Sequence, residues 1–307
     1  MDKQFDAIDH HPYVQTHVRM HITRAHREAM VGLLFVLPAI IPLLIFVIYP
    51  MMSALYLSFT NWQLVGAPVM RGGGNYTALF GDGQFLQSLL VTLEISVGTA
   101  LPLALLAFIV ALLLDAHVRF TAWYQPLIFL PTILPTVVTA VVWGMLYQGN
   151  GIINVSLGLT IPWLTEARWA LPALIFMLIW TNLGYFAVIM LAGVREIPRD
   201  YYEAARIDGA NSFMTVWHIT LPLVRPVLLF VIVIATSQAL TLFAQPYLLT
   251  QGGPGDATRP LAELIYDTAF SYLNIGKASA MSFVLLVLSL IVVYVQFSLL
   301  RTKDVES

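Results

Sequence analysis

One short charged segment, residues 203–222, separates two long apolar runs and holds the residues best suited to a specific interaction. A helix is predicted to start near Tyr201, because Asp200 is a plausible N-cap with Glu203 three residues later. Gly209 marks the predicted end of this helix, since glycine readily takes the left-handed conformation that follows a last helical turn.

A second short helix should follow the first one. Asn211 or Ser212 can cap it, and it is expected to run to about His218. The Leu221-Pro222 pair is then predicted to break the pattern before the next apolar run, because proline lacks an N–H and clashes with the preceding turn. Residues 203–222 therefore predict a helix–turn–helix.

The predicted helices combine small and large apolar side chains. Ala205 and Gly209 lie four residues apart on one face, which would let another backbone approach closely. Phe213, Met214 and Trp217 offer apolar anchors from the second helix. Such an element suits insertion into a groove on another protein. The alternative is an interfacial helix that lies on the surface of a membrane.

The elements around this segment must sit in lipid. Of the 307 residues, 59% are hydrophobic and only 10% are charged, whereas soluble domains average about 45–50% and about 25%. A soluble core of this composition would expose large apolar patches and aggregate. The formal net charge of −2 indicates no nucleic-acid partner. The absence of cysteine excludes disulfides and thiolate metal sites.

Six segments are long and apolar enough to cross about 30 Å of hydrocarbon as helices. They are residues 30–59, 87–114, 122–147, 170–193, 223–245 and 279–300. We therefore predict an all-α integral membrane protein with six transmembrane helices. The helix–turn–helix would lie between the fourth and fifth spans.

Prolines predict irregularities in two of these spans. Pro38, Pro42 and Pro50 indicate a kink or an interfacial end in the first span, and Pro131 and Pro135 indicate a bend in the third. Membrane helices tolerate such breaks because neighbouring groups satisfy the freed carbonyls.

The basic residues predict the orientation of the chain. Six crossings put both termini on one side, and that side receives 11 of the 15 Lys and Arg residues against 4 on the other. The positive-inside rule then predicts that both termini and residues 203–222 face the cytoplasm. The chain would comprise a tail (1–29), one six-span domain (30–300) and a short C-terminal tail (301–307) in the cell (inner) membrane.

The spans offer little for ion coupling or catalysis. Apart from Arg225 at the edge of the fifth span, Glu94 is the one charged side chain within them, whereas ion-driven carriers use several intramembrane charges. Gly276-Lys277 lacks the other residues of a phosphate-binding loop, and no HExxH or Ser/His/Asp pattern appears. We therefore expect no cofactor on this chain, and uphill transport would need a partner that supplies energy.

Glu94 itself has two open interpretations. A charge at this depth costs about 3 kcal/mol on insertion scales, so the side chain should face the helix bundle or water. It would then have either a structural partner or a role in a solute path.

Polar residues in spans four and five could line a solute path. They are Asn182, Tyr185, Gln238, Thr241 and Gln245. This set supplies hydrogen-bond donors, acceptors and an aromatic face for a hydroxyl-rich solute. Hydrogen bonding between helices of the bundle is an equally good explanation.

The N-terminal tail is rich in histidine, with His10, His11, His17, His21 and His26. His17 and His21 could share a metal ion if the tail were helical, but no third ligand has a convincing spacing. No metal site is predicted, and a disordered or surface-lying tail is expected.

The pattern "EAARIDGA…ITLP" resembles the EAA motif of binding-protein-dependent ABC importer permeases, in which EAA and DGA precede a hydrophobic residue and LP. The matching residues are Glu203, Ala204, Ala205, Asp208, Gly209, Ala210, Ile219, Leu221 and Pro222. The resemblance implies that residues from about 195 to 222 form a coupling loop in a cleft of an ATP-binding subunit. Glu203 would meet a basic side chain there.

Other stretches support the same resemblance. "YLLTQGGPGDATRPLAELIYDTAF" and "IGKASAMS" resemble the external loop and sixth span of sugar-importing permeases, which implies that Gly252, Gly253 and Pro254 lie near a binding protein. "FVIYPMMSALYLSFTNW" and "GNYTALF" resemble the first, MalF-like, of two paralogous permeases. The "GGGNY" stretch departs from the Gly-Leu pair that relatives often carry.

The resemblance implies several partners. These are a MalG-like second permease, a dimer of ATP-binding subunits that binds ATP and Mg, an extracytoplasmic solute-binding protein, and a carbohydrate or glycerol-phosphate-type solute. A self-sufficient six-span carrier or channel, or a membrane-embedded enzyme, remains as an alternative. Transport by the purified chain without ATP would favour the carrier, and hydrolytic or transferase activity on a lipid-linked substrate would favour the enzyme.

Overall fold

The computed structural model describes residues 16–64, 66–116 and 121–300 and divides the chain into two compact units between Tyr56 and Leu57. Within these residues the chain is helical, apart from one antiparallel pair of two-residue strands. The strands are β1 (Thr60–Asn61) and β2 (Val69–Met70). The predicted all-α class is confirmed.

The first predicted span is a continuous helix with one wide turn. It comprises α1 (Thr16–Leu43), the π-turn η1 (Leu44–Ile48) and α2 (Tyr49–Ser58). The N–H of Tyr49 bonds to the carbonyl of Leu44, five residues back, directly before Pro50. This wider turn relieves the clash between a proline ring and the carbonyl four residues earlier. The expected irregularity is thus a π-turn rather than a broken helix.

Three long helices form the core of the second unit. They are α4 (Gly83–Asp115), α8 (Ala167–Glu196) and α11 (Leu221–Leu240). Their shared cluster combines alanines of α4 with large residues of α8, such as Ala107 with Phe186. Small residues on α4 let the helix axes approach, which is how membrane helices gain packing energy. The last helix of the described residues is α14 (Ile275–Leu300).

The third predicted span is bent, as its prolines indicate. Helices α5 (Thr121–Ile133) and α6 (Thr136–Leu146) meet at an angle of 100° around Pro135. The described residues therefore hold five helices that could cross a membrane, or six if this bent pair counts as one span.

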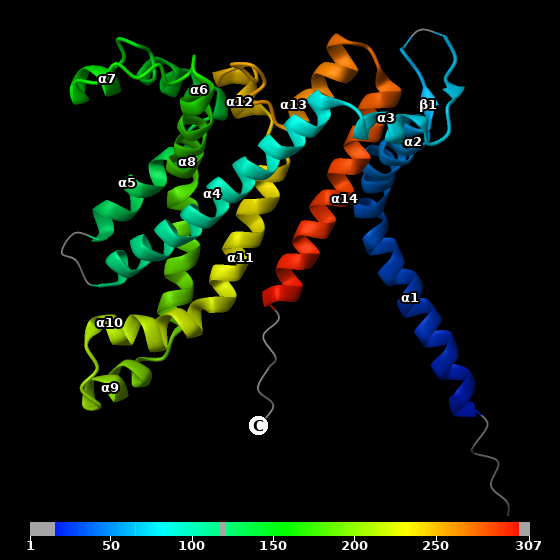
Figure 1. The fold of residues 1–307 in the computed structure, drawn as a ribbon. Helices are drawn as coiled ribbons and strands as arrows, with labels where there is room; N and C mark the ends of the chain where they lie inside the picture. The colour runs from blue at the N-terminus through cyan, green and yellow to red at the C-terminus, as the bar shows by residue number, and fades with distance from the viewer. Residues whose placement is uncertain (1–15, 65, 117–120, 301–307) are drawn as a thin grey trace, which may run out of the picture. The chain divides into compact units, whose positions relative to one another are not determined.

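The second unit carries shorter elements at both ends of the α4–α8–α11 core (Figure 1). One end, here called the α9–α10 end, holds α9 (Arg199–Ile207), α10 (Ser212–Thr215) and the π-turn η2 (Val216–Thr220). The opposite end is called the α12–α13 end. Its elements are α3 (Gly74–Phe80), α7 (Ile152–Leu157), α12 (Ala244–Leu249), α13 (Leu261–Tyr266) and the π-turn η3 (Asp267–Ser271).

The predicted break at Leu221-Pro222 is wrong. Helix α10, η2 and α11 form one apolar helix from Ser212 to Leu240, whereas the sequence predicted a span over 223–245. The N–H of Leu221 bonds to the carbonyl of Val216, five residues back. This π-turn makes room for the ring of Pro222, so the helix continues.

Candidate functional site

The start of α9 differs from the prediction by one or two residues. Pro198, not Asp200, is the N-cap, and the N–H of Tyr201 bonds to the Pro198 carbonyl at 3.3 Å. Asp200 instead lies in the first turn, where a carboxylate interacts favourably with the helix dipole. The predicted cap at Asp200 is therefore wrong, although the helix is present.

The turn between α9 and α10 has the predicted geometry. Gly209 has a φ of +77°, and the N–H of Ala210 bonds to the carbonyl of Ala205 at 2.9 Å. This is the hydrogen-bond pattern of a glycine-terminated helix. The Oδ1 atom of Asn211 accepts the N–H of Met214 at 2.8 Å, so Asn211 is the cap of the second helix.

Most of the residues that match the EAA pattern are available to a partner. Glu203, Ala204, Asp208, Gly209 and Pro222 are exposed. The other four are not: Ala210, Ile219 and Leu221 are half-buried, and Ala205 is only 7% exposed, buried by this chain. The predicted Ala205–Gly209 face for close approach is therefore wrong as a partner surface.

Large apolar side chains are exposed on α9, on α10 and on the π-turn η2. Phe213 is 76% exposed and Trp217 is 58% exposed, and their rings stack with centroids 6.4 Å apart. Ile207, Met214 and Tyr201 are also exposed. These five large apolar side chains on α9, α10 and η2 are thus left uncovered by the described residues.

The same end has a charged hollow. It has a volume of about 1100 Å³, lies between the ends of α4 and α8 and the α9–α10 segment, and is lined in part by Glu203 and Arg206. An ion pair at 3.5 Å between Arg195 and Asp115 closes one side. Among the described residues, neither Glu203 nor Arg206 forms an ion pair. A pairing of Glu203 with Arg206 is thus absent from this surface, and the carboxylate stays available.

A polar pocket collects four of the five residues predicted for a solute path. Asn182, Gln238, Thr241 and Gln245 line one pocket of about 510 Å³ between α4, α8, α11 and α12. Tyr185 does not line it, and packs edge-on against Phe186 at 5.1 Å. Asn182 comes from α8 and Gln238 and Thr241 from the end of α11, as predicted, whereas Gln245 belongs to α12.

The pocket also contains a residue that the sequence did not single out. Thr99 of α4 lines it, is almost fully buried, and its Oγ1 has no hydrogen-bond partner in the described chain. Of the twelve lining residues, none carries an ionisable side chain. A serine or threonine on an apolar helix is common, so nothing in the sequence marks Thr99.

Hydrogen bonds between helices are made by other residues. The Nδ2 of Asn182 donates to the Leu178 carbonyl of its own helix at 2.8 Å. Bonds between helices come instead from Gln296 Nε2 to Thr236 Oγ1 at 2.9 Å and from Thr132 Oγ1 to the Thr181 carbonyl at 3.0 Å. For the pocket residues, the described contacts therefore favour the pocket-lining interpretation.

Glu94 does not face the bundle of this chain. It is exposed on α4 in line with exposed Leu90, Val97 and Leu101. Thr99 and Leu103, which line the pocket, follow five and nine residues later and so lie on the opposite side of the helix. Of the two orientations expected for Glu94, the one toward the bundle of this chain is therefore excluded, and its carboxylate has no partner among the described residues.

The predicted external loop is packed tightly against the α12–α13 end. Gly252 has a φ of +74°, and a Cβ atom there would lie 2.6 Å from Arg259 Nε and 2.8 Å from Glu263 Oε1. Thr258 Oγ1 donates to the Gly253 carbonyl at 2.7 Å. Gly252 is buried, while Gly253 and Pro254 are half-buried. Only part of this loop can therefore meet a partner.

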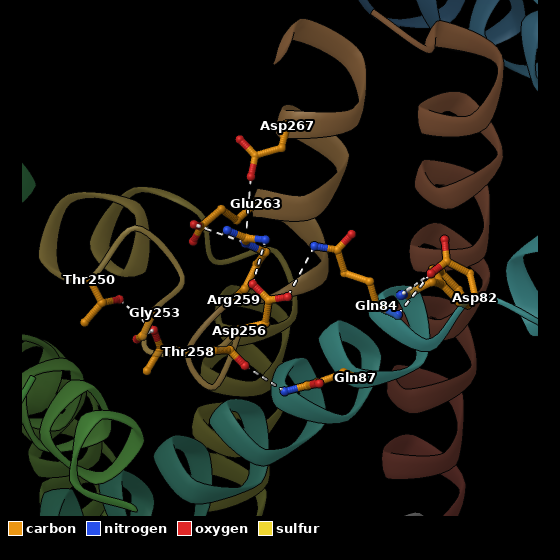
Figure 2. A network of polar contacts seen from close by, with 12 residues as sticks. Asp82, Gln84, Gln87, Thr250, Gly253, Asp256, Thr258, Arg259, Glu263 and Asp267 are labelled. Carbon is orange, nitrogen blue, oxygen red and sulfur yellow. Dashed lines mark hydrogen bonds and ion pairs between the residues drawn. The ribbon is translucent and has the colours of Figure 1, made fainter. Parts of the chain in front are cut away.

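A charged network holds the loop in place (Figure 2). Arg259 Nη1 lies 2.7 Å from Asp256 Oδ1, and its Nε lies 3.9 Å from Glu263 and 3.8 Å from Asp267. Gln84 Nε2 at the start of α4 donates to Asp256 at 3.3 Å. Three carboxylates thus share one guanidinium, and the spacing of four residues between Arg259, Glu263 and Asp267 was the available signal in the sequence.

Two carboxyl groups at this end have shifted pKa values. Burial raises the pKa of Glu263 to about 7, with Arg259 lowering it and the neighbouring Asp267 and Asp256 raising it. Burial also raises the pKa of Asp82, but hydrogen bonds from Lys277 and from backbone N–H groups outweigh it and hold that pKa below its usual value. Lys277 Nζ lies 2.6 Å from Asp82 Oδ2.

The described residues contain no group of three side chains that could hold a metal ion. The side chains of His10, His11, His17, His21 and His26 lie outside the described part of the chain. A disordered tail is wrong for residues 16–29, which belong to α1, while the interpretation of the histidine side chains stays a prediction.

Comparison with known proteins identifies a family of transport proteins and similar permeases. A family model described as "Binding-protein-dependent transport system inner membrane component" matches residues 103–303. The chain is 36% identical over 272 residues to the probable ABC transporter permease protein YesP of Bacillus subtilis, covering 85% of this chain and 87% of that protein. It is 32% identical to the trehalose/maltose transport system permease protein MalF of Thermococcus litoralis, covering 90% and 96%.

A solved structure has the same fold. The chain superposes with a TM-score of 0.81 on a subunit of a bacterial ABC transporter involved in the import of the acidic polysaccharide alginate. The match covers 92% of this chain and 99% of that subunit at 22% identity. The arrangement of helices described above is therefore that of an importer permease.

Proposed function

The chain belongs to the family of binding-protein-dependent transport system inner membrane components, and we propose that it is the MalF-like subunit of an ATP-driven importer for sugars. It is a multi-pass membrane permease. In the proposed complex it forms the translocation path with a MalG-like permease. A dimer of separate subunits binds ATP and Mg and hydrolyses the ATP, and a solute-binding protein delivers the solute.

The observation that carries the proposal is the uncovered surface at the α9–α10 end. Glu203 has no partner among the described residues, and the stacked Phe213 and Trp217 are exposed on the helix that follows α9. A helix pair that presents an anchor of this kind suits a groove on another protein. In the proposed orientation, with both termini in the cytoplasm, this surface meets the ATP-binding subunit.

The pocket supports a sugar as the solute. Its lining offers amide and hydroxyl groups from Asn182, Gln238, Thr241 and Gln245, and no charged side chain among the described residues. A phosphate or phosphodiester group buried there would have no cation to offset its desolvation, whereas a sugar hydroxyl would find hydrogen-bond partners. The pocket thus favours a neutral carbohydrate over a glycerol-phosphate-type solute. The names of relatives such as the trehalose/maltose permease agree with this choice.

The coupling role is tested by Glu203→Lys in the complex purified from its native host through a tag on this chain. Reversal of the charge should lower ATP-dependent uptake at least tenfold while the chain still inserts into the membrane. Glu28→Lys, an exposed charge reversal on α1 and outside the coupling loop, is the matched control and should leave uptake unchanged. Normal uptake by Glu203→Lys would remove the docking role.

The same preparation distinguishes the alternatives. Copurification of a second permease and an ATP-binding subunit with the tagged chain is the expected result. Transport by this chain alone in liposomes without ATP would instead show a self-sufficient carrier, and the proposal would fail.

A further inference from the structure

Four aromatic rings form a continuous ladder at the α12–α13 end. The ring centroids of Phe243 and Tyr247 are 5.2 Å apart, and Tyr266 lies 5.0 Å from the first and 5.6 Å from the second. Phe270 continues the ladder at 5.1 Å from Tyr266. Each step is within the range of direct ring contact.

The two ends of the ladder lie in different surroundings. Phe243 lines the polar pocket beside Gln245. Tyr266 is 37% exposed and Phe270 is 67% exposed. The ladder therefore runs from an open surface into the pocket, whereas an aromatic cluster that only filled the core would be buried along its whole length.

The backbone under the ladder is firmly held. Leu261 and Leu264 of α13 are buried in a cluster with Met281 of α14. The N–H of Leu261 donates to Thr92 Oγ1 of α4 at 2.8 Å. The π-turn η3 closes with a bond from the Tyr272 N–H to the Asp267 carbonyl at 2.8 Å. The rings of Tyr266 and Phe270 are thus presented by an element anchored on two long helices.

The chemistry of the ladder suits a sugar. A pyranose ring carries C–H groups on one face and hydroxyls around its edge, so it can stack on an aromatic ring while its hydroxyls stay hydrated. Tyr247 and Tyr266 add hydroxyl groups that can exchange hydrogen bonds with the sugar edge. Successive rings about 5 Å apart would allow a sugar to move without losing all its contacts at any step.

We propose that Phe270, Tyr266, Tyr247 and Phe243 form a carbohydrate track that guides a neutral sugar from the α12–α13 surface into the polar pocket. The inference rests on the proposed function, whose orientation puts this end outside the cell. The occupant is the solute itself. The competing occupant of the exposed rings is the surface of the binding protein.

The test uses the purified complex in liposomes with its binding protein and the neutral sugar that the wild type takes up, chosen from a panel of mono- to trisaccharides. Two quantities are measured at subsaturating sugar: the ATP hydrolysis stimulated by the binding protein, and the sugar delivered per ATP hydrolysed. Phe270→Leu and Tyr266→Leu should each lower the sugar delivered per ATP about threefold to tenfold, since each removes one stacking contact. Stimulated ATP hydrolysis should stay at the wild-type level.

Two further variants separate ring loss from general damage. Tyr272→Leu changes an exposed aromatic next to the ladder, which makes no ring contact among the described residues, and should have no effect. Phe270→Tyr keeps the ring and should restore delivery to within about twofold. A Phe270→Tyr variant as defective as Phe270→Leu would overturn the track.

The remaining outcomes distinguish the carbohydrate track from the alternatives. Wild-type delivery per ATP in both leucine variants would overturn the track while leaving the importer function intact. Loss of stimulation at constant delivery per ATP would assign the exposed rings to the binding protein instead. A wild-type complex that neither responds to the binding protein nor takes up any sugar of the panel would contradict the importer function itself, and the track with it.

Discussion

The α9–α10 end and the α12–α13 end of the second unit satisfy their polar and apolar groups in different ways. At the α12–α13 end, Arg259 is shared among three carboxylates, and loop, α4 and α14 are joined by side-chain bonds. At the α9–α10 end, Glu203 lacks a partner among the described residues and Phe213 and Trp217 are uncovered. The first end holds itself together, and the second presents groups that only another chain can satisfy.

Two glycines, one at each end, show the same difference in packing. Gly209 and Gly252 have nearly the same φ, +77° and +74°, but a Cβ would meet nothing within 4 Å at Gly209 and would clash with Arg259 and Glu263 at Gly252. An alanine would therefore cause similar backbone strain at Gly209 and at Gly252, and the two substitutions differ only in the packing of the added Cβ atom.

The largest expected effect comes from Gly252→Ala. It should lower the free energy of unfolding by about 3 kcal/mol, because strain at positive φ adds to displacement of the Arg259 network. Gly209→Ala, the matched control, should cost about 1 kcal/mol from strain alone. The apparent melting temperatures of the two complexes in detergent give the ranking. Equal shifts would show that the loop at Gly252 can relax, and the contrast between the ends would be lost.

The next effect concerns assembly rather than folding. Phe213→Ala with Trp217→Ala removes exposed anchors, so the melting temperature of this chain should hardly change. Binding of the ATP-binding subunit should weaken at least about tenfold, since buried aromatic anchors dominate interface energy. Phe80→Ala truncates an exposed aromatic at the other end and serves as control. Unchanged recovery of the ATP-binding subunit on the double variant would place its docking surface elsewhere.

The charged network predicts a pH dependence through Glu263. Its pKa is about 7 in the folded protein against an ordinary 4.5, so the folded state binds more protons than the unfolded state between these values. Stability from this group is therefore present at low pH and falls as the pH rises through 7.

Glu263→Gln keeps the neutral form at every pH. The variant should melt like the wild type at pH 5 and at a higher temperature at pH 8, with Glu196→Gln as an exposed control. A variant that melts lower than the wild type at pH 8 would mean that the ionised carboxylate stabilises the network through Arg259.

The smallest effect tests the cap at the α9–α10 end. Asn211→Ala should cost about 1 kcal/mol of local stability and lower the hydrogen-exchange protection of residues 212–215. Ser212→Ala should not, because the structure assigns the cap to Asn211. The reverse ranking would contradict this assignment.

Proline and glycine positions predicted where helices bend and end better than the sequence predicted which side chains are buried. The bend around Pro135 and the turn at Gly209 followed from the conformational limits of proline and glycine. The break expected at Pro222 is absent, because a π-turn accommodates the proline ring. The position of a π-turn cannot be predicted from the pattern of a single sequence.

The orientation of side chains within spans was harder to predict. Helix α4 is apolar all round, since both the bundle and the lipid are apolar, so its sequence lacks the one-sided pattern that marks the buried face of a soluble helix. The sequence therefore left Glu94 facing either the bundle or water, and in the structure it points away from the bundle. Thr99, on the pocket side, was not identified from the sequence. Tyr185 and Asn182, three residues apart, could not be assigned to different surroundings for the same reason.

The unbroken helix from Ser212 to Leu240 has a mechanical consequence. Phe213 at one end and Gln238 near the pocket are 25 residues apart on the same rod, a span of about 37 Å. A movement of the helix end that carries Phe213 would therefore shift or tilt the part of the helix that lines the pocket. The helix departs from regular α-helical hydrogen bonding at the π-turn Val216–Thr220 and at Pro226, and bending at these points would reduce the movement that reaches the pocket.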